Sequence, residues 1–224
     1  SLVGAGTIVG SLTAQADALI QVGPAALPQL ATQYVFDDFE SYDLGYVRTV
    51  ASPPWTAHGG GSGTMFAAIE DDSGNQVFSF GWTDDFRGAS RPLPAGLEIE
   101  EGDVATLFCR FKCLTDTPNH TLGLGDQATT DDVYFTDYEA QIRLYADSIS
   151  TSGTYGLDAR NGSAFVDLVD GLTTNTWYNV WMVVDQATDT MDVYLNTGTA
   201  DATTANKLNS TPLSFRYGTT DPLN

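Results

Sequence analysis

Four of the nine basic residues in this chain fall on the polar side of predicted strands, where they could bind an anionic ligand. Apolar and polar residues alternate along 107–113, 138–145 and 154–160, and residues two positions apart share one face of a strand. Arg110, Lys112, Arg143 and Arg160 all lie on the polar face in this pattern. Guanidinium groups bind carboxylates and sulfates through paired hydrogen bonds, so we expect an acidic glycan as ligand if these strands are neighbours.

Uncharged side chains complete the candidate glycan-binding set. Gln141 and Tyr145 share a face with Arg143, and Trp181 offers an aromatic ring on which a sugar could stack. The whole set is Arg110, Lys112, Gln141, Arg143, Tyr145, Arg160 and Trp181.

A structural interpretation of the same residues needs no ligand. Opposite charges on neighbouring strands pair with each other, so Arg143 could pair with Glu139 or Asp158. A Trp in a sandwich strand is more often buried than exposed, and we expect Trp177 in the core, with Trp181 balanced between core and surface. The sequence leaves both interpretations open.

A cluster of carboxylates near the start of the predicted domain is the best local candidate for a metal site. Asp37, Asp38 and Glu40 lie close together, and carboxylate oxygens are ligands for Ca²⁺. Calcium takes about six to eight oxygens, so other residues would have to contribute as well. These residues are the candidate site for a structural Ca²⁺ ion, and the other interpretation, which the acidic composition favours, is a solvated acidic turn.

The net charge limits the classes of partner. The 224 residues include 29 acidic and 9 basic side chains, which gives a formal net charge of −20. Phosphate backbones and anionic membranes would be repelled, so we expect no nucleic acid partner. So acidic a chain is typical of a protein that stays soluble in salty or extracellular surroundings.

Short runs of aromatic and β-branched residues, separated by turn signals, predict an all-β fold. The clearest runs are 104–114, 138–146, 153–160 and 177–185. Asn161-Gly162 favours a tight hairpin with a type I′ turn. Helical periodicity is not sustained anywhere in the chain, so we expect little helix. The length suits one antiparallel two-sheet β-sandwich of jelly-roll type.

The two cysteines, Cys109 and Cys113, fall in one predicted strand. Residues four apart in a strand are separated by roughly 13 Å. A disulfide needs Cα atoms within about 7 Å, so we expect two buried free thiols.

Residues 1–34 differ from the rest of the chain and are treated as an N-terminal arm, with 35–224 as the folded domain. The arm carries a single charge, Asp17, and Ala14-Gln15-Ala16 follows an apolar run in the manner of a secretory cleavage site. Polar residues interrupt the run, so we expect no membrane span. The arm is either signal-like or an assembly segment that makes a homo-oligomer by docking on a neighbouring copy.

Several segments carry a resemblance to a known fold family. The order FDDFESY, GDVATLFCRF, YEAQIRLY, LDARNGSAF and TWYNVWMVVD is similar to laminin-G-like and concanavalin-A-like jelly-roll domains of secreted bacterial proteins. The resemblance covers about residues 35–220, and it implies a glycan-recognising or surface-building protein, extracellular or at the cell surface. Such domains usually have a further strand that pairs with the first, whereas this sequence stops at Asn224. An unpaired sheet edge accepts an added strand, and the arm is a candidate for that role.

The resemblance also implies that a minority of such proteins cleave polysaccharides. Glycosidases of this fold carry E-x-D-x-x-E on one strand, and none of the six Glu residues here begins that pattern. Lyases use an Arg or Gln to neutralise the acidic sugar and a His or Tyr to move a proton. Gln141-Ile142-Arg143 is similar to their Q-I-H pattern, but Arg143 stands in the place of the His. We therefore name no catalytic residues and lean against an enzyme.

These observations predict an extracellular, non-catalytic glycan-binding or adhesion β-sandwich whose partner is a polysaccharide, with an anionic one favoured. One alternative is a self-assembling structural subunit of a surface layer, sheath or filament that uses the arm. The other is a polysaccharide lyase of the concanavalin-A-like fold. Because one fold hosts many functions, the site has to decide among them.

Overall fold

The computed structural model describes residues 37–47, 55–58, 67–80, 88–126, 135–148, 151–198 and 202–224. The predictions on the arm at residues 1–34 lie outside these ranges. Within them, no helix combines the length and the apolar character that crossing a membrane requires.

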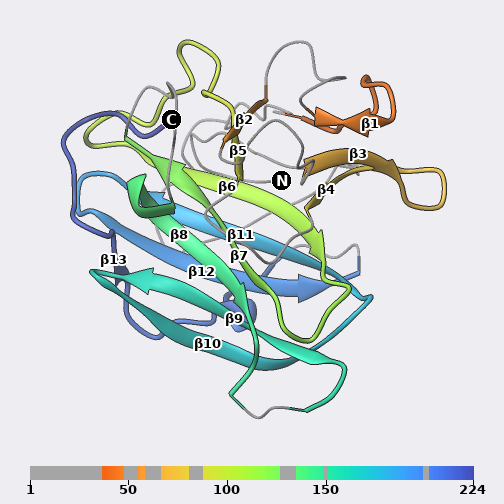
Figure 1. Ribbon diagram of the computed structural model, residues 1–224. Helices are drawn as coiled ribbons and strands as arrows, with labels where there is room; N and C mark the ends of the chain where they lie inside the picture. Colours follow the sequence, from red (N-terminus) through yellow and green to blue (C-terminus); the bar gives the residue numbers. More distant parts are fainter. Residues whose placement is uncertain are drawn as a thin grey trace.

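Two four-stranded antiparallel sheets form the body of the protein (Figure 1). The first has the order β10-β9-β8-β7 and is built from β7 (Asn119–Gly125), β8 (Tyr138–Tyr145), β9 (Thr154–Asn161) and β10 (Ala164–Thr173). The second has the order β13-β12-β11-β6 and is built from β6 (Val104–Lys112), β11 (Trp177–Asp185), β12 (Thr190–Thr197) and β13 (Leu213–Ser214).

Smaller elements lie beside these sheets. A three-stranded sheet of order β1-β3-β4 contains β1 (Gly45–Tyr46), β3 (Ala67–Asp71) and β4 (Gln76–Phe80), at the upper right of Figure 1. A two-stranded ribbon pairs β2 (Thr56–His58) with β5 (Gly88–Ser90). The helical turns in the described residues are the short 3₁₀ segments η1 (Phe135–Asp137) and η2 (Thr204–Asn206).

The main core lies between the two four-stranded sheets. Strand alternation sends Leu107 and Cys109 of β6 and Val180 of β11 toward Ile142 of β8 and Leu157 of β9, all in one buried cluster. The antiparallel two-sheet β-sandwich that the sequence predicts is therefore confirmed. Because the inner positions of β6, β8 and β9 are apolar, the polar residues between them must point to the outer faces of the sandwich.

The predicted hairpin after Asn161 forms, but its turn differs in register and type. Asn161 pairs with Ala164 as the last rung of the β9–β10 ladder, so the two-residue loop is Gly162-Ser163. Gly162 has a φ of 61°, and neither Asn161 nor Ser163 has a positive φ. This is the pattern of a type II′ turn, in which glycine occupies the first loop position.

The end of the chain is tied into the domain. Leu223 forms an antiparallel bridge with Ile99 and is fully buried, and Asn224 exchanges backbone hydrogen bonds with Gly125. Just before this, Leu213–Ser214 form β13, which pairs with β12. These contacts hold the described C-terminal residues against β12, Ile99 and Gly125.

The two cysteines are free and buried, as the strand geometry predicts. Burial raises the pKa of Cys109 to about 12 and also raises the pKa of Cys113, so little of either thiol is present as the reactive thiolate. We expect both thiols to resist a disulfide-exchange reagent at pH 8 in the native protein and to react fully in denaturant without reductant. A denatured, unreduced chain that shows no reactive thiol would contradict this assignment.

Candidate functional site

The structure separates the predicted basic residues onto two different sheets. Arg110 and Lys112 belong to β6, whereas Arg143 and Arg160 belong to β8 and β9 of the other sheet. The inner faces of both sheets meet in the core, so the two pairs lie on opposite outer faces of the sandwich. The predicted single basic face is therefore wrong, since strand alternation gives the face of a side chain but not the sheet that holds its strand.

On the outer face of β6 and β11, the cations surround Trp177 rather than a sugar platform. Lys112 is directly opposite Trp177 in the ladder, and its Nζ lies 5.1 Å from the ring centre, while the guanidinium carbon of Arg110 lies 5.2 Å away. Lys112 also forms an ion pair of 2.5 Å with Asp72 in the turn between β3 and β4. Trp177 is half-buried on this outer face, so its expected place in the core is wrong.

Trp181 is the buried tryptophan of β11. Only 3% of its surface is exposed, and its ring lies 5.0 Å from that of Phe108, centre to centre. Tyr194 and Ala202 complete this second apolar cluster, on the outer side of the β6–β11–β12 sheet. A buried ring cannot stack on a glycan, so the glycan-binding role predicted for Trp181 is wrong.

On the outer face of the other sheet, Arg143 pairs with a carboxylate across the strands. Asp158 of β9 is directly opposite Arg143 of β8. Its Oδ2 accepts hydrogen bonds from Nε of Arg143, at 3.1 Å, and from Nη2. The cross-strand pair that the sequence offered as an alternative is thus present.

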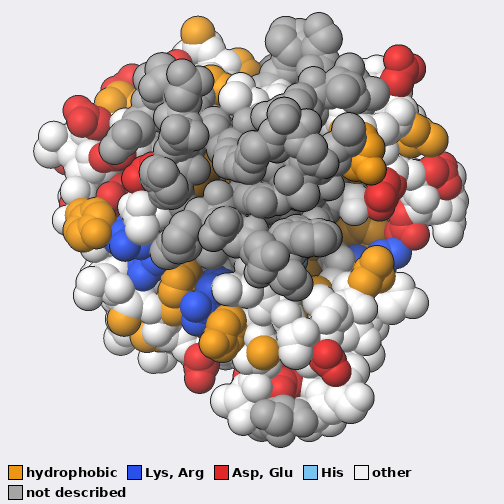
Figure 2. All heavy atoms as spheres, in the orientation of Figure 1, with side chains coloured by type: hydrophobic (Ala, Val, Ile, Leu, Met, Phe, Trp, Pro, Cys, Tyr) orange, Lys and Arg blue, Asp and Glu red, His pale blue; other side chains and the backbone are white. Residues whose placement is uncertain are grey.

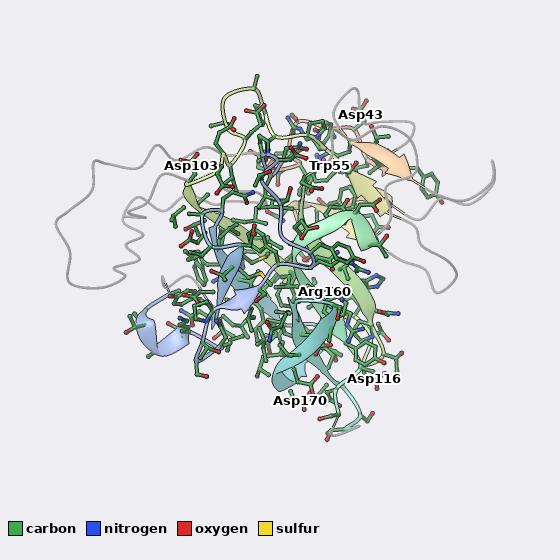
Figure 3. All side chains as sticks on the ribbon, turned by 90° about the vertical axis from the view of Figure 1, so that its left-hand side faces the viewer. Asp43, Trp55, Asp103, Asp116, Arg160 and Asp170 are labelled. Carbon is green, nitrogen blue, oxygen red and sulfur yellow. The ribbon has the colours of Figure 1, made fainter. Side chains whose placement is uncertain are left out.

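Arg160 extends the cationic row next to this pair. Its Nε donates to Oε1 of Gln141 at 3.1 Å, and its Nη1 donates to the carbonyl of Ser163 at 3.0 Å. Arg160 is only 3% exposed and lies within the body of the domain (Figure 3). Its third donor atom, Nη2, is buried and has no hydrogen-bond partner among the described residues. A buried, unsatisfied guanidinium nitrogen is a feature that calls for a ligand or an ordered water.

Aromatic rings flank both guanidinium groups. The guanidinium carbon of Arg143 lies 4.0 Å from the ring centre of Tyr145 and 4.1 Å from that of Phe165 in β10. The guanidinium carbon of Arg160 lies 3.9 Å from the same Phe165 ring. Tyr145 remains 41% exposed. Stacking holds the guanidinium planes in fixed orientations, which prepares them for a planar anionic group.

A third arginine joins from the C-terminal segment. The main chain of Arg216 donates from its N–H to the carbonyl of Glu139, and Oε2 of Glu139 accepts the N–H groups of Tyr217 and Gly218 at 2.8 and 3.0 Å. These bonds hold the segment against the first residues of β8. The Tyr217 ring, 5.1 Å from the Arg216 guanidinium, is 72% exposed.

We call this group of side chains the arginine face and define it by its residues: Gln141, Arg143, Tyr145, Arg160, Phe165, Arg216 and Tyr217. Gln141 and Arg160 are buried in it, whereas Tyr145 and Tyr217 are exposed. Figure 2 shows Lys and Arg side chains gathered beside hydrophobic ones in its left half, in the region of β8, β9 and β13. Three of these residues, Phe165, Arg216 and Tyr217, were not predicted from the sequence. Alternation along β10 could have indicated Phe165, but no local pattern marks the other two residues, which reach the site only through the path of the folded chain.

Two neighbouring cations affect the pKa of Arg160. Burial lowers this pKa, and the positive charges of Arg216 and Arg143 lower it further. An anion bound beside Arg160 would raise this pKa again, because an opposite charge favours the charged form of the guanidinium.

The predicted metal residues lie elsewhere, at the small sheet. Oδ2 of Asp37 accepts hydrogen bonds from Tyr42, Trp55 and Arg91, and the Arg91 contact of 2.9 Å is an ion pair. Asp38 accepts the N–H of Glu40, and Glu40 accepts the N–H of Gln76 on β4. In the described part of the chain, no three His, Cys, Asp or Glu side chains are grouped as metal ligands. A guanidinium beside Asp37 would repel a cation, so the contacts do not favour calcium at this trio, and structural Ca²⁺ stays a prediction.

Comparison with known proteins assigns no family. No family model matches the chain, and no curated protein matches its sequence. Among solved structures, the chain is similar to a native heptameric SAP-like pentraxin from Limulus polyphemus, with 16% sequence identity and a TM-score of 0.31. The match covers 56% of this chain and 52% of the pentraxin, so it spans about half the length of that protein. A likeness of this extent supports no statement on function, which has to be argued from the arginine face.

The chemistry available at the arginine face is that of binding and orienting an anion. Its polar groups are guanidinium donors, a glutamine amide and tyrosine hydroxyls, and the carboxylates of Asp158 and Glu139 accept hydrogen bonds beside them. His120 of β7 is directly opposite Leu144, so it shares the inner side of the sheet, and burial lowers its pKa. It therefore does not face the arginines.

Proposed function

We propose that this protein is an extracellular, non-catalytic β-sandwich that binds an anionic polysaccharide at the arginine face. The observation that carries the proposal is the gathering of Arg143, Arg160 and Arg216 on one outer face of a chain whose net charge is −20. Three of only nine basic residues meet there, beside the carboxylates of Asp158, Asp167 and Glu139.

The geometry also favours a sugar acid over a simple ion. Two exposed rings, Tyr145 and Tyr217, lie beside guanidinium groups of the face. Aromatic rings take up the apolar side of a sugar, while neighbouring guanidinium groups bind its carboxylate or sulfate. The Asp158 carboxylate neutralises the guanidinium of Arg143. In the described residues, the buried Nη2 of Arg160 has no hydrogen-bond partner.

The proposal predicts a loss of binding when one cation is removed from the arginine face. Arg216→Gln should weaken binding of sulfated or uronic acid oligosaccharides about tenfold or more, because a hydrogen bond to a charged group contributes roughly 1.5–3 kcal/mol. Isothermal titration calorimetry with oligosaccharides chosen from a glycan array measures this effect.

Arg110→Gln is the matched control for this experiment. It removes the same charge from the opposite outer face, beside Trp177. If the arginine face is the site, Arg110→Gln should change affinity less than twofold. Equal losses in both variants would contradict the proposal, because they would show that affinity depends only on the total charge of the chain.

A lyase is the second candidate, and one observation favours it. Gln141, Arg143 and Tyr145 alternate along β8, so an amide, a cation and a phenol occupy one face of one strand. In a lyase, the amide and cation would neutralise a uronate and the phenol would move a proton. Incubation with uronic acid polymers tests this, since a lyase makes unsaturated products that absorb in the ultraviolet. The self-assembling subunit rests on residues 1–34, which lie outside the described ranges, and it stays a prediction.

A further inference from the structure

Two aspartates face each other at the edge of the arginine face. In the ladder between β9 and β10, Asp167 is directly opposite Asp158. Asp158 is buried and Asp167 is exposed. Like charges directly opposite on one sheet face are unfavourable, so this pair has a reason to hold a proton.

The surroundings of Asp158 act on its protonation in opposite directions. Arg143 donates two hydrogen bonds to the same oxygen, Oδ2, of Asp158. Burial raises the pKa of Asp158, Arg143 lowers it, and the charge and hydrogen bond of Asp167 raise it again, with the net direction upward. Two carboxyl groups that interact with each other take up protons as a coupled pair.

The charged and titratable groups around the pair come from the neighbouring strands and from the C-terminal segment. On β8, the residues of this face are Gln141, Arg143 and Tyr145, with Glu139 bound to the backbone of Tyr217 and Gly218. On β7, Thr121 is opposite Arg143 and carries no charge. Arg160 and Phe165 lie on the same face of β9 and β10, and Arg216 approaches Arg160 from the C-terminal segment. Between pH 5 and neutrality, the arginines stay charged and the tyrosines stay neutral.

We propose that Asp158 and Asp167 form a proton-sharing pair that makes the arginine face bind anions more tightly as the pH falls. The inference rests on the proposed function, because the anion is the ligand of that face. Taking up one proton removes one negative charge from beside Arg143, and the anion then meets a more positive surface. Binding and proton uptake are linked, so each favours the other.

The size of the effect follows from the distance between the charges. A unit charge a few ångströms from the ligand, near a protein surface, changes its affinity by roughly tenfold. We therefore expect affinity to rise about five- to tenfold from pH 7.5 to pH 5.

The test uses a sulfated dextran oligosaccharide, because sulfate stays ionised throughout this range and any pH dependence then belongs to the protein. Affinity is measured by calorimetry at pH 5, 6 and 7.5 for the full chain, for Asp167→Asn and for Asp43→Asn. Asp43 is exposed and lies near β1, away from Arg160 (Figure 3), so its replacement is a matched change of charge outside the site.

We expect Asp167→Asn to bind the oligosaccharide more tightly than the natural chain at pH 7.5. Its affinity should lose most of the dependence on pH, whereas the affinity of Asp43→Asn should keep it. If the natural chain and Asp167→Asn bind with the same dependence on pH, the inference is wrong and the proposed function stands. If no variant binds sulfated or uronic acid oligosaccharides at any pH, the proposed function itself is wrong.

A second measurement needs no ligand and no change of sequence. Carbon NMR of the aspartate carboxyl groups, followed from pH 8 to pH 3, should show Asp158 and Asp167 responding to one shared protonation step. Two independent steps at ordinary aspartate values would overturn the inference, even if the oligosaccharide binds.

Discussion

Replacing Trp181 by Ala should lower the free energy of unfolding by about 4 kcal/mol, in the range typical of a buried Trp. The side chain fills the centre of the apolar cluster with Phe108, Tyr194 and Ala202, and almost none of its surface is exposed. Truncation would leave a cavity on the outer side of β6, β11 and β12, which the regular backbone of three paired strands cannot collapse to fill. Urea unfolding followed by far-ultraviolet circular dichroism measures the loss.

Trp177→Ala is the control for this experiment, because it removes the same side chain four residues away on the same strand and face. Trp177 is half-buried and contacts cations rather than an apolar cluster, so we expect a loss of about 1 kcal/mol. Equal losses for the two variants would show that the cluster around Trp181 does not carry the stability assigned to it. Oligosaccharide binding of any folded Trp181 variant should stay unchanged, since the ring lies on the sheet opposite the arginine face.

Replacing Asp37 by Ala should destabilise the protein by about 3 kcal/mol, because breaking a largely buried ion pair leaves its partner without a compensating charge. Asp37 connects Arg91, Trp55 and Tyr42 through one carboxylate oxygen, and its Oδ1 accepts the N–H of Phe39. Burial and the hydrogen bond to Asp37 raise the pKa of Tyr42 to about 12, so the Tyr42 hydroxyl stays protonated and donates at all ordinary pH values. Thermal and urea unfolding both report the loss.

The neighbouring variant Asp38→Ala isolates this effect from a general change of charge. Asp38 is exposed, and its side chain accepts the N–H of Glu40 at 3.2 Å. Its removal should change the free energy of unfolding by less than about 1 kcal/mol. A loss as large as that of Asp37→Ala would contradict the ion-pair explanation.

The same two variants test the calcium site predicted at Asp37, Asp38 and Glu40. A rise in the thermal unfolding midpoint of the natural chain on adding calcium, absent in both variants, would support that site.

Strand alternation made the faces of single strands predictable. Ala140 and Ile142 point into the core while Gln141 and Arg143 point away, because successive side chains of any strand point to opposite sides. The rise of an extended strand separates Cys109 and Cys113 by roughly 13 Å, which is too far for a disulfide. The hairpin after Asn161 was predicted because glycine accepts the backbone angles of a tight turn. Its register shifted by one residue, since pairing along β9 and β10 places Gly162 rather than Asn161 first in the loop.

By itself, then, the sequence determined an all-β sandwich, its main strands and the side of each strand on which Arg110, Lys112, Arg143 and Arg160 lie. These properties depend on local periodicity and on turn residues, which act over a few positions. Only the tertiary structure decided that Arg143 and Arg160 meet Arg216 while Arg110 and Lys112 lie on the opposite face, and that Trp181 is buried while Trp177 is not. Those outcomes depend on which strands pair and on what covers each sheet, and long-range packing between distant segments sets both.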